Sequence, residues 1–256
     1  MRINLLGPLE IVVDNHVRTP TTPKVRTVLA LLLMDPDETI STECIIEELW
    51  GGAAPRSAAG TIQTYIYQLR KAIHGLSSPE SDGRISLVTK PAGYQLRVNS
   101  AHIDAYEFDD LVRDGRAAML SGEADRASAL LQQALRLWRG PALGGVECGQ
   151  RLGAYVARLE ENRLNALEYR IEADLMRGRH RELIGELKAL VTIHPLHEWL
   201  YSRLMLALHM SGRRFEALEV YQSLRRGLRE EFGLDPSTEL QQMQRALLSG
   251  SVAGYR

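Results

Sequence analysis

The 256-residue sequence has few features of secreted, membrane or disulfide-stabilised proteins. It contains only two cysteines, Cys44 and Cys148, which exclude a disulfide framework and are typical of reduced intracellular thiols. The apolar run near Met1 is too short for a signal peptide. No apolar stretch approaches the roughly 18 residues of a membrane span. We therefore expect a cytoplasmic protein with no membrane partner.

Enzyme signatures are also missing. The sequence has neither the G-x-x-x-x-G-K-[ST] pattern nor the G-x-G-x-x-G pattern of nucleotide-binding proteins. His194 and His197 lack the spacing of a zinc-binding H-E-x-x-H motif, and Pro195 interrupts the helix that would align their rings. We expect no enzymatic activity, no metal and no cofactor.

Net charge is nearly absent, because 31 Lys and Arg residues face 32 Asp and Glu residues. The charges are nevertheless unevenly placed. Residues 1–55 contain four basic and eight acidic side chains, whereas residues 56–97 contain six basic and two acidic ones. A locally basic segment suggests a surface that faces phosphates, although a solvated charged face would give the same composition.

The spacing of apolar residues in the first hundred positions changes from strand-like to helical and back. Residues 1–19 are predicted to form a short antiparallel sheet. Three amphipathic helices follow, beginning near Pro23, Ser41 and Ser57, and the third extends to His74. After a polar loop over residues 75–83, residues 85–98 are predicted to form a β-hairpin. This order is that of a winged helix-turn-helix.

The third helix places its apolar residues on one face and polar residues on the other. Gln and Arg side chains on such a face can contact base edges in the major groove, where helix-turn-helix proteins place a helix. Cations at the ends of the helices and at the hairpin can contact phosphates, helped at the first helix by its dipole. The predicted DNA contacts are Lys24, Arg26, Arg56, Ser57, Gln63, Thr64, Tyr67, Gln68, Arg70, Lys71, His74 and Lys90.

The second half of the sequence is helical in its periodicity. Similar segments begin at Gly178 and Gly212, and their offset of 34 residues is the tetratricopeptide period. We therefore predict a mostly α protein with an N-terminal winged helix-turn-helix (α+β) over residues 1–99. An all-α, tetratricopeptide-like domain is predicted over residues 104–250, where such arrays often present a concave protein-binding groove.

Several short motifs, in this order, resemble the Streptomyces antibiotic regulatory proteins. They are LGPL at residues 6–9, KVR at 24–26, LWG at 49–51, LR at 69–70, LVTKPAGYQL at 87–96, LRLWRG at 135–140, GRH at 178–180, HPLHE at 194–198, LAL at 206–208, SGR at 211–213 and GLDP at 233–236. This sequence departs from the family pattern at two places. Asn15 stands where the family commonly has a turn glycine, and Gln-Leu-Arg-Lys at residues 68–71 stands where a Ser-Arg-Leu-Arg-Arg-like run is frequent.

The resemblance implies an OmpR-like winged-helix DNA-binding domain followed by a bacterial transcriptional activation domain. Such proteins are pathway-specific activators of antibiotic gene clusters. The implied partners are double-stranded promoter DNA with direct repeats, a second copy of the chain on that DNA, and RNA polymerase holoenzyme including its sigma factor. The third helix would contact the major groove, and the turn over residues 51–56 would face the polymerase.

A second hypothesis is a helical-repeat adaptor that binds another protein and makes no direct contact with bases. The polar face of residues 57–74 distinguishes the two, because only a DNA-binding protein requires it. Deleting residues 104–256 should spare DNA binding and abolish activation.

Overall fold

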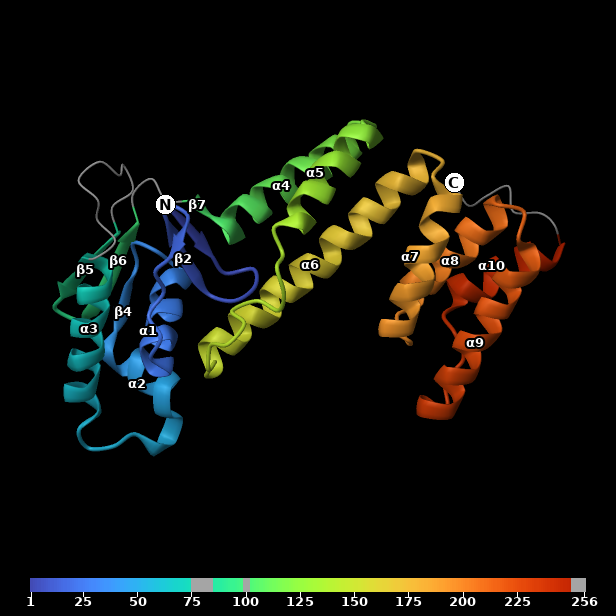
Figure 1. Ribbon diagram of the computed structural model, residues 1–256. Coiled ribbons are helices and arrows are strands. Elements are labelled where there is room, and N and C mark those ends of the chain that lie inside the picture. Colours follow the sequence, from blue (N-terminus) through green and yellow to red (C-terminus); the bar gives the residue numbers. More distant parts are fainter. Residues whose placement is uncertain (75–84, 99–101, 250–256) are drawn as a thin grey trace. The chain divides into compact units, whose positions relative to one another are not determined.

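The computed structural model describes residues 1–74, 85–98 and 102–249, and the predicted loop over residues 75–83 lies outside this part (Figure 1). The chain divides into two compact units. Unit 1 comprises Met1–Ala117 and Ala129–Glu168, and unit 2 comprises Ala118–Ser128 and Tyr169–Arg256. Among the described residues, no helix is both long and apolar enough to cross a membrane.

Unit 1 begins with the predicted antiparallel sheet, which gains one further strand. Its order is β3-β2-β1-β7, and only the pairing of β1 with β7 is parallel. The tight turn between β2 and β3 is made by Asp14 and Asn15, both at positive φ, as their residue types favour. The strands are β1 (Arg2–Asn4), β2 (Glu10–Val13), β3 (His16–Val17) and β7 (His102–Ile103).

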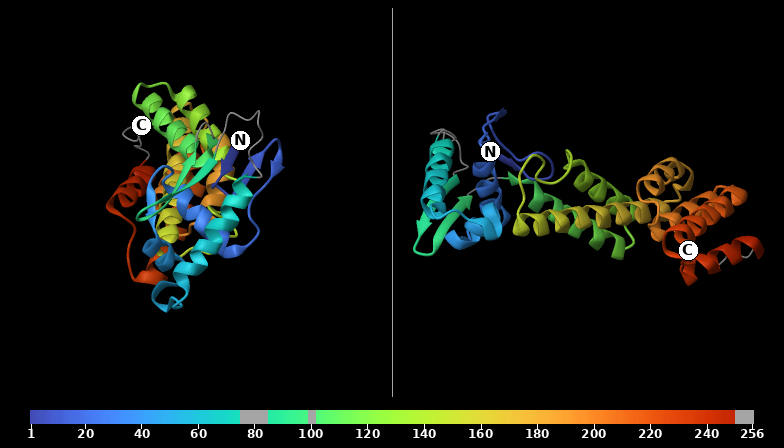
Figure 2. Two further views of the ribbon diagram at one scale, coloured as in Figure 1. Left: turned by 90° about the vertical axis from the view of Figure 1, so that its left-hand side faces the viewer. Right: turned by 90° about the horizontal axis from the view of Figure 1, so that it is seen from below.

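Three helices and a second sheet complete the predicted winged helix. The second sheet has the antiparallel order β4-β6-β5, in which β5 and β6 form the wing hairpin. The left view of Figure 2, which faces α3, shows this hairpin beside the helix. The elements are α1 (Pro23–Met34), β4 (Thr39–Ser41), α2 (Thr42–Trp50), the 3₁₀ helix η1 (Gly51–Ala53), α3 (Ala58–His74), β5 (Ile85–Lys90) and β6 (Gly93–Val98).

Local sequence explains where these helices begin and which face they bury. Pro23 stands at the start of α1, and the Ser41 side chain accepts a hydrogen bond from the Cys44 backbone N–H at 3.1 Å to cap α2. The predicted apolar face of α3 is largely confirmed. Helical spacing places Ala59 on the same face, but Ala59 is exposed. The buried residues of α3 are Ala58, Ile62, Ile66, Leu69 and Ile73.

The tip of the wing is fixed by a glycine. β4 pairs with β6 so that Ser41 lies opposite Gly93. A Cβ atom at Gly93 would collide with the backbone carbonyl of Ile40, so no other residue allows β4 to approach this closely. The start of α2 and the tip of the wing are thereby held together.

The core of unit 1 includes residues well beyond the predicted domain boundary. Phe108, Leu143, Leu152 and Leu159 belong to the same buried cluster as the strands and helices of the winged helix. They come from α4 (Asp104–Leu120), from α6 (Gln150–Met176) and from the segment that links α6 to α5 (Ala124–Arg136). The domain boundary near residue 100 stays a prediction. The compact unit and its buried core extend past that residue.

Two buried carboxylates join these distant segments. Asp104 accepts hydrogen bonds from the backbone N–H groups of Leu5 and Leu6, at 2.7 and 3.0 Å. Glu48, in the last turn of α2, is only 6% exposed and accepts hydrogen bonds from three backbone N–H groups at the start of α6. These donors are Gly149 at 2.7 Å, Arg151 at 2.9 Å and Leu152 at 3.1 Å. A carboxylate at a helix N-terminus satisfies free donors and matches the helix dipole.

Unit 2 contains the predicted helical repeat. α7 and α9 begin 34 residues apart, at His180 and Arg214, and α8 packs against both. Gly122, Gly178 and Gly212 each have φ between 73° and 78°, and each lies two residues before a helix. After each glycine, the next N–H donates to the carbonyl five residues earlier, which is a Schellman C-cap. The helices of the array are α7 (His180–Ile193), α8 (Glu198–Met210), α9 (Arg214–Phe232) and α10 (Thr238–Ser249).

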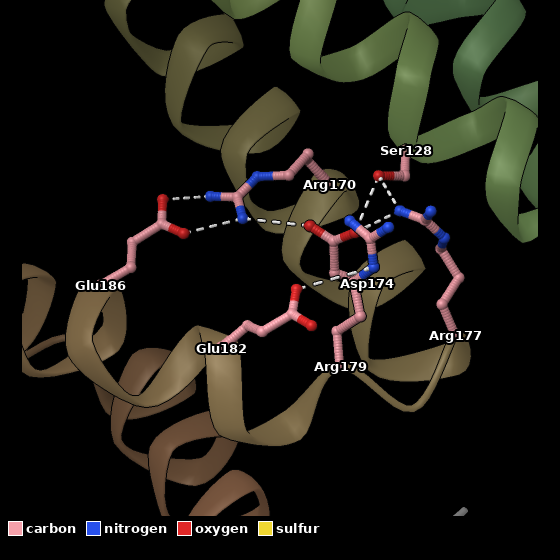
Figure 3. A network of polar contacts seen from close by, with 7 residues as sticks. All are labelled: Ser128, Arg170, Asp174, Arg177, Arg179, Glu182 and Glu186. Carbon is pink, nitrogen blue, oxygen red and sulfur yellow. Dashed lines mark hydrogen bonds and ion pairs between the residues drawn. The ribbon is translucent and has the colours of Figure 1, made fainter.

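A buried ionic network joins α5, α6 and α7 in unit 2 (Figure 3). Arg170 and Asp174 are each 7% exposed and form an ion pair at 3.3 Å on α6. Arg170 also pairs with Glu186 of α7. On the other side, Asp174 accepts hydrogen bonds from Ser128 of α5 at 2.7 Å and from Arg177 at 2.9 Å. Each buried charge therefore has partners on more than one side.

Candidate nucleic-acid interface

The outer face of α3 has the composition expected of a DNA-contacting helix. The helix contains no acidic residue, and its last turn is basic. Tyr67 is 68% exposed, so its ring and hydroxyl are accessible to a partner. The predicted contacts that lie exposed on this helix are Gln63, Thr64, Tyr67, Gln68, Arg70, Lys71 and His74.

Two further predicted contacts precede α3. Arg56 and Ser57 are both exposed, in the segment that links η1 to α3. The Ser57 carbonyl accepts hydrogen bonds from the N–H and the hydroxyl of Thr61, so the entry to the helix is ordered. The side chains of Arg56 and Ser57 therefore lie near the N-terminus of α3, where backbone N–H groups are available to a phosphate.

The wing lies next to this helix. Lys90 is half-buried, ends β5, and pairs with Gly93 across the turn formed by Pro91 and Ala92. Its position at the tip of the hairpin is as the sequence predicts. A cation at such a tip can contact the DNA backbone.

Arg70 connects the helix to the wing. Its Nε donates to the Leu87 carbonyl at 3.3 Å, and a terminal nitrogen donates to the Thr89 hydroxyl at 2.6 Å. Both acceptors lie on β5. The planar guanidinium thus holds α3 and the wing in one surface, a role that the ammonium of a lysine would not match.

The structure gives Lys24 and Arg26 partners inside unit 1. Lys24 Nζ lies 3.4 Å from the Leu49 carbonyl and 4.6 Å from the centroid of the Trp50 ring. A terminal nitrogen of Arg26 lies 3.5 Å from the Leu9 carbonyl. Both side chains are half-buried. Their assignment as phosphate contacts stays a prediction.

The structure also shows residues that were not among the predicted contacts. Thr89, which lies in the LVTKPAGYQL motif, holds Arg70, and Glu48, which lies outside the quoted motifs, holds α6 to α2. Trp50 is part of the LWG motif at residues 49–51, so the sequence marks it as a family residue. The motif does not show that Trp50 contacts Lys24. The rings of His194 and His197 lie 6.3 Å apart at the turn between α7 and α8.

Comparison with known families covers almost the whole chain. Residues 103–248 match the bacterial transcriptional activator domain, and residues 16–96 match the family described as transcriptional regulatory protein, C terminal. The regulatory protein DnrI of Streptomyces peucetius is 44% identical over 253 residues, which cover 97% of this chain and 92% of that protein. The chain belongs to the Streptomyces antibiotic regulatory protein family.

Two other relatives, AfsR and EmbR, are longer than this chain. The regulatory protein AfsR of Streptomyces coelicolor is 37% identical, and the match covers 99% of this chain but 25% of AfsR. The solved structure of Mycobacterium tuberculosis EmbR in complex with a low affinity phosphopeptide superposes with a TM-score of 0.87 at 31% identity. That match covers 97% of this chain and 65% of the EmbR chain.

Membership in the antibiotic regulatory family confirms the predicted fold and the predicted class of function. The protein is a DNA-binding transcription activator of the class that regulates antibiotic gene clusters. It is a transcription regulator, and the winged helix is the part that matches the DNA-binding family.

Proposed function

We propose that this antibiotic regulatory protein acts in the cytoplasm, binds direct repeats in a promoter as two protomers side by side, and recruits RNA polymerase holoenzyme including its sigma factor. One observation carries the proposal. The outer face of α3 is exposed and free of acidic residues, and Arg70 holds the wing against its C-terminal half. Such a surface fits the major groove and the backbone beside it.

The residues of this surface divide by the chemistry of their side chains. The amides of Gln63 and Gln68 each present a donor and an acceptor, which is the pattern that pairs with adenine. Thr64 can donate or accept, and Tyr67 offers a ring and a hydroxyl. We assign these four side chains to base contacts. The proposed phosphate contacts are Arg56, Ser57, Lys71, His74 and Lys90.

The near-neutral charge of the chain favours binding in pairs. Non-specific affinity for DNA increases with the number of phosphates that cations neutralise, and one protomer presents few cations on this face. When two protomers bind adjacent repeats, the second binding event is favoured by its high effective concentration. Contacts with the polymerase would add to this effect, and we place them on the exposed segment over residues 51–56.

Selection of duplexes from random DNA with the purified protein tests the proposal. We expect a repeated half-site. Gln63→Ala should change the preferred base at one position in each half-site, by about 1–3 kcal/mol. Lys71→Ala should weaken binding to all sequences and reduce the slope of log affinity against log salt by about one.

Arg181→Ala is the matched control. Arg181 is an exposed cation in unit 2, so its loss changes the net charge equally without touching α3. Enrichment of no sequence would contradict DNA recognition and favour the protein adaptor. The same selected sequence for Gln63→Ala and the unaltered protein would contradict the base contact.

A further inference from the structure

Lys24 contacts the C-terminal end of α2 and not the outer face of α3. Its ammonium lies 3.4 Å from the carbonyl of Leu49 and 4.6 Å from the Trp50 ring. The last carbonyls of a helix lack intrahelical partners and carry partial negative charge, so a cation there is stabilising. A cation over a tryptophan ring adds a second attraction to the same side chain.

These two contacts lie where the chain leaves α2. Trp50 is half-buried and packs against the core of unit 1. The next residue, Gly51, has φ +55 and starts η1, after which Gly52–Ser57 are all exposed. Because these residues are exposed and η1 contacts α2, the direction of the segment depends on how Leu49 and Trp50 are held.

The last turn of α2 is held from a second side as well. Glu48 binds the first N–H groups of α6, and Gly149 approaches so closely that a Cβ atom there would collide with the Glu48 carbonyl. Lys24 from α1 and the start of α6 therefore both contact residues 48–50. This turn is a fixed support for the segment that follows it.

We infer that Lys24 is a positioning residue for the segment over residues 51–56 and is not a phosphate contact. The inference rests on the proposed function, in which this segment meets the polymerase. Lys24 holds Leu49 and Trp50 in place, and they in turn set the direction in which the segment leaves α2. Loss of its charge then reduces activation and leaves DNA binding as it was.

The experiment uses the full chain, a duplex selected from random DNA by the unaltered protein, and a promoter that carries this duplex. Transcription is measured with Streptomyces RNA polymerase holoenzyme at saturating activator. For Lys24→Met, which keeps the apolar stem, we expect unchanged DNA affinity and salt slope. Activation should fall about three- to tenfold, the effect on an equilibrium of losing contacts of this strength.

Lys24→Arg should retain most of the activation, because a guanidinium can stack on Trp50 and donate to Leu49. Lys24→Gln keeps a donor without the charge, and it replaces Lys24→Met if the latter does not fold. Lys71→Ala is the matched control with the opposite result, in which affinity and slope fall and saturating protein restores activation.

Two results would overturn the inference. A slope reduced by one for Lys24→Met, with activation restored at saturation, would make Lys24 a phosphate contact. Full activation at unchanged affinity would show that its contacts do not position the segment. Failure of the unaltered protein to activate this promoter would instead contradict the proposed function, whatever the variants do.

Discussion

The two compact units of this protein are assembled in different ways. In unit 1, contacts join segments that are far apart in the sequence, such as Asp104 with Leu5 and Glu48 with Leu152. In unit 2, each helix of the array packs mainly on the next one, and charged side chains such as Arg170 and Glu186 link neighbours. Unit 1 therefore requires all its parts at once, whereas unit 2 resembles a repeat array with locally additive stability.

Truncation of unit 1 should have the largest effect on folding. A fragment of residues 1–99 lacks Phe108, Leu143, Leu152 and Leu159, all buried in the core of unit 1. Their loss removes roughly 6–12 kcal/mol of apolar burial, as much as the folding free energy of a typical domain. We expect no cooperative urea transition for residues 1–99. A fragment of residues 1–168 should fold and bind the selected duplex.

This expectation reverses the one drawn from sequence, in which the first predicted domain binds DNA by itself. The reason is that the sequence domains end near residue 100 whereas the buried core does not. Cooperative unfolding and normal DNA affinity of residues 1–99 would show that the shared core is not needed.

The buried network of unit 2 gives the next largest effect. Asp174→Ala leaves Arg170 without its partner on α6 and also removes an acceptor for Ser128. Removing one member of a buried ion pair costs about 3–5 kcal/mol, so the unfolding transition of unit 2 should occur at lower urea. DNA affinity should not change, because unit 1 keeps its own core.

Asp235→Ala is the control for this variant. Asp235 pairs with Arg225 and Arg229 in the same unit, but its side chain is about half exposed. Exposed pairs contribute about 0–1 kcal/mol, so this change should be barely measurable. Equal losses for the two variants would mean that burial of the network does not matter.

A smaller effect is expected from the contact between α3 and the wing, which lies at the surface of unit 1. Arg70→Gln and Thr89→Val each remove the hydrogen bond between the two side chains. Because both residues are exposed, folding stability should change by no more than about 1 kcal/mol. Both should weaken binding of the selected duplex to a similar extent, without a change in salt slope. A slope lowered only by Arg70→Gln would indicate a phosphate contact for Arg70.

The smallest effect concerns a partly exposed carboxylate of unit 2, that of Glu216. Arg213 and Lys188 lower the pKa of Glu216 to about 2, chiefly through hydrogen bonds to its carboxylate. A lowered pKa means stability that is present above pH 4.5 and is lost as the pH falls towards 2. Glu216→Gln should thus be slightly less stable than the unaltered protein at pH 7. The two should converge in acid, and a difference that persists at pH 2 would contradict this cause.

Sequence periodicity was sufficient for the elements that bury one face. The buried residues of α3, the wing hairpin and the 34-residue repeat follow from spacing alone, because each pattern is local. Spacing wrongly predicts that Ala59 is buried, because alanine at the edge of an apolar face can be either buried or exposed. The strand β4 has three residues, too few to show a period.

The contacts of individual cations could not be predicted in the same way. Lys24 and Lys71 have the same chemistry and both lie on helices, so composition assigns them the same role. Their difference comes from packing, because α1 places Lys24 against the end of α2 whereas nothing in the described residues covers Lys71. The hydrogen bonds of the buried Glu48 and Asp104 carboxylates could not be predicted for the same reason, because their partners are distant in the sequence.

The hydrogen bonds of Asp104 and Glu48 also set an order of events during synthesis. Leu5 and Leu6 leave the ribosome long before Asp104, and Glu48 long before the start of α6. At about 5–20 residues per second, the winged helix would wait several seconds for the start of α6. During that interval the apolar faces that α6 later covers are exposed. A nascent chain of this protein is therefore open to chaperones, and closed to DNA, until α6 has begun to emerge.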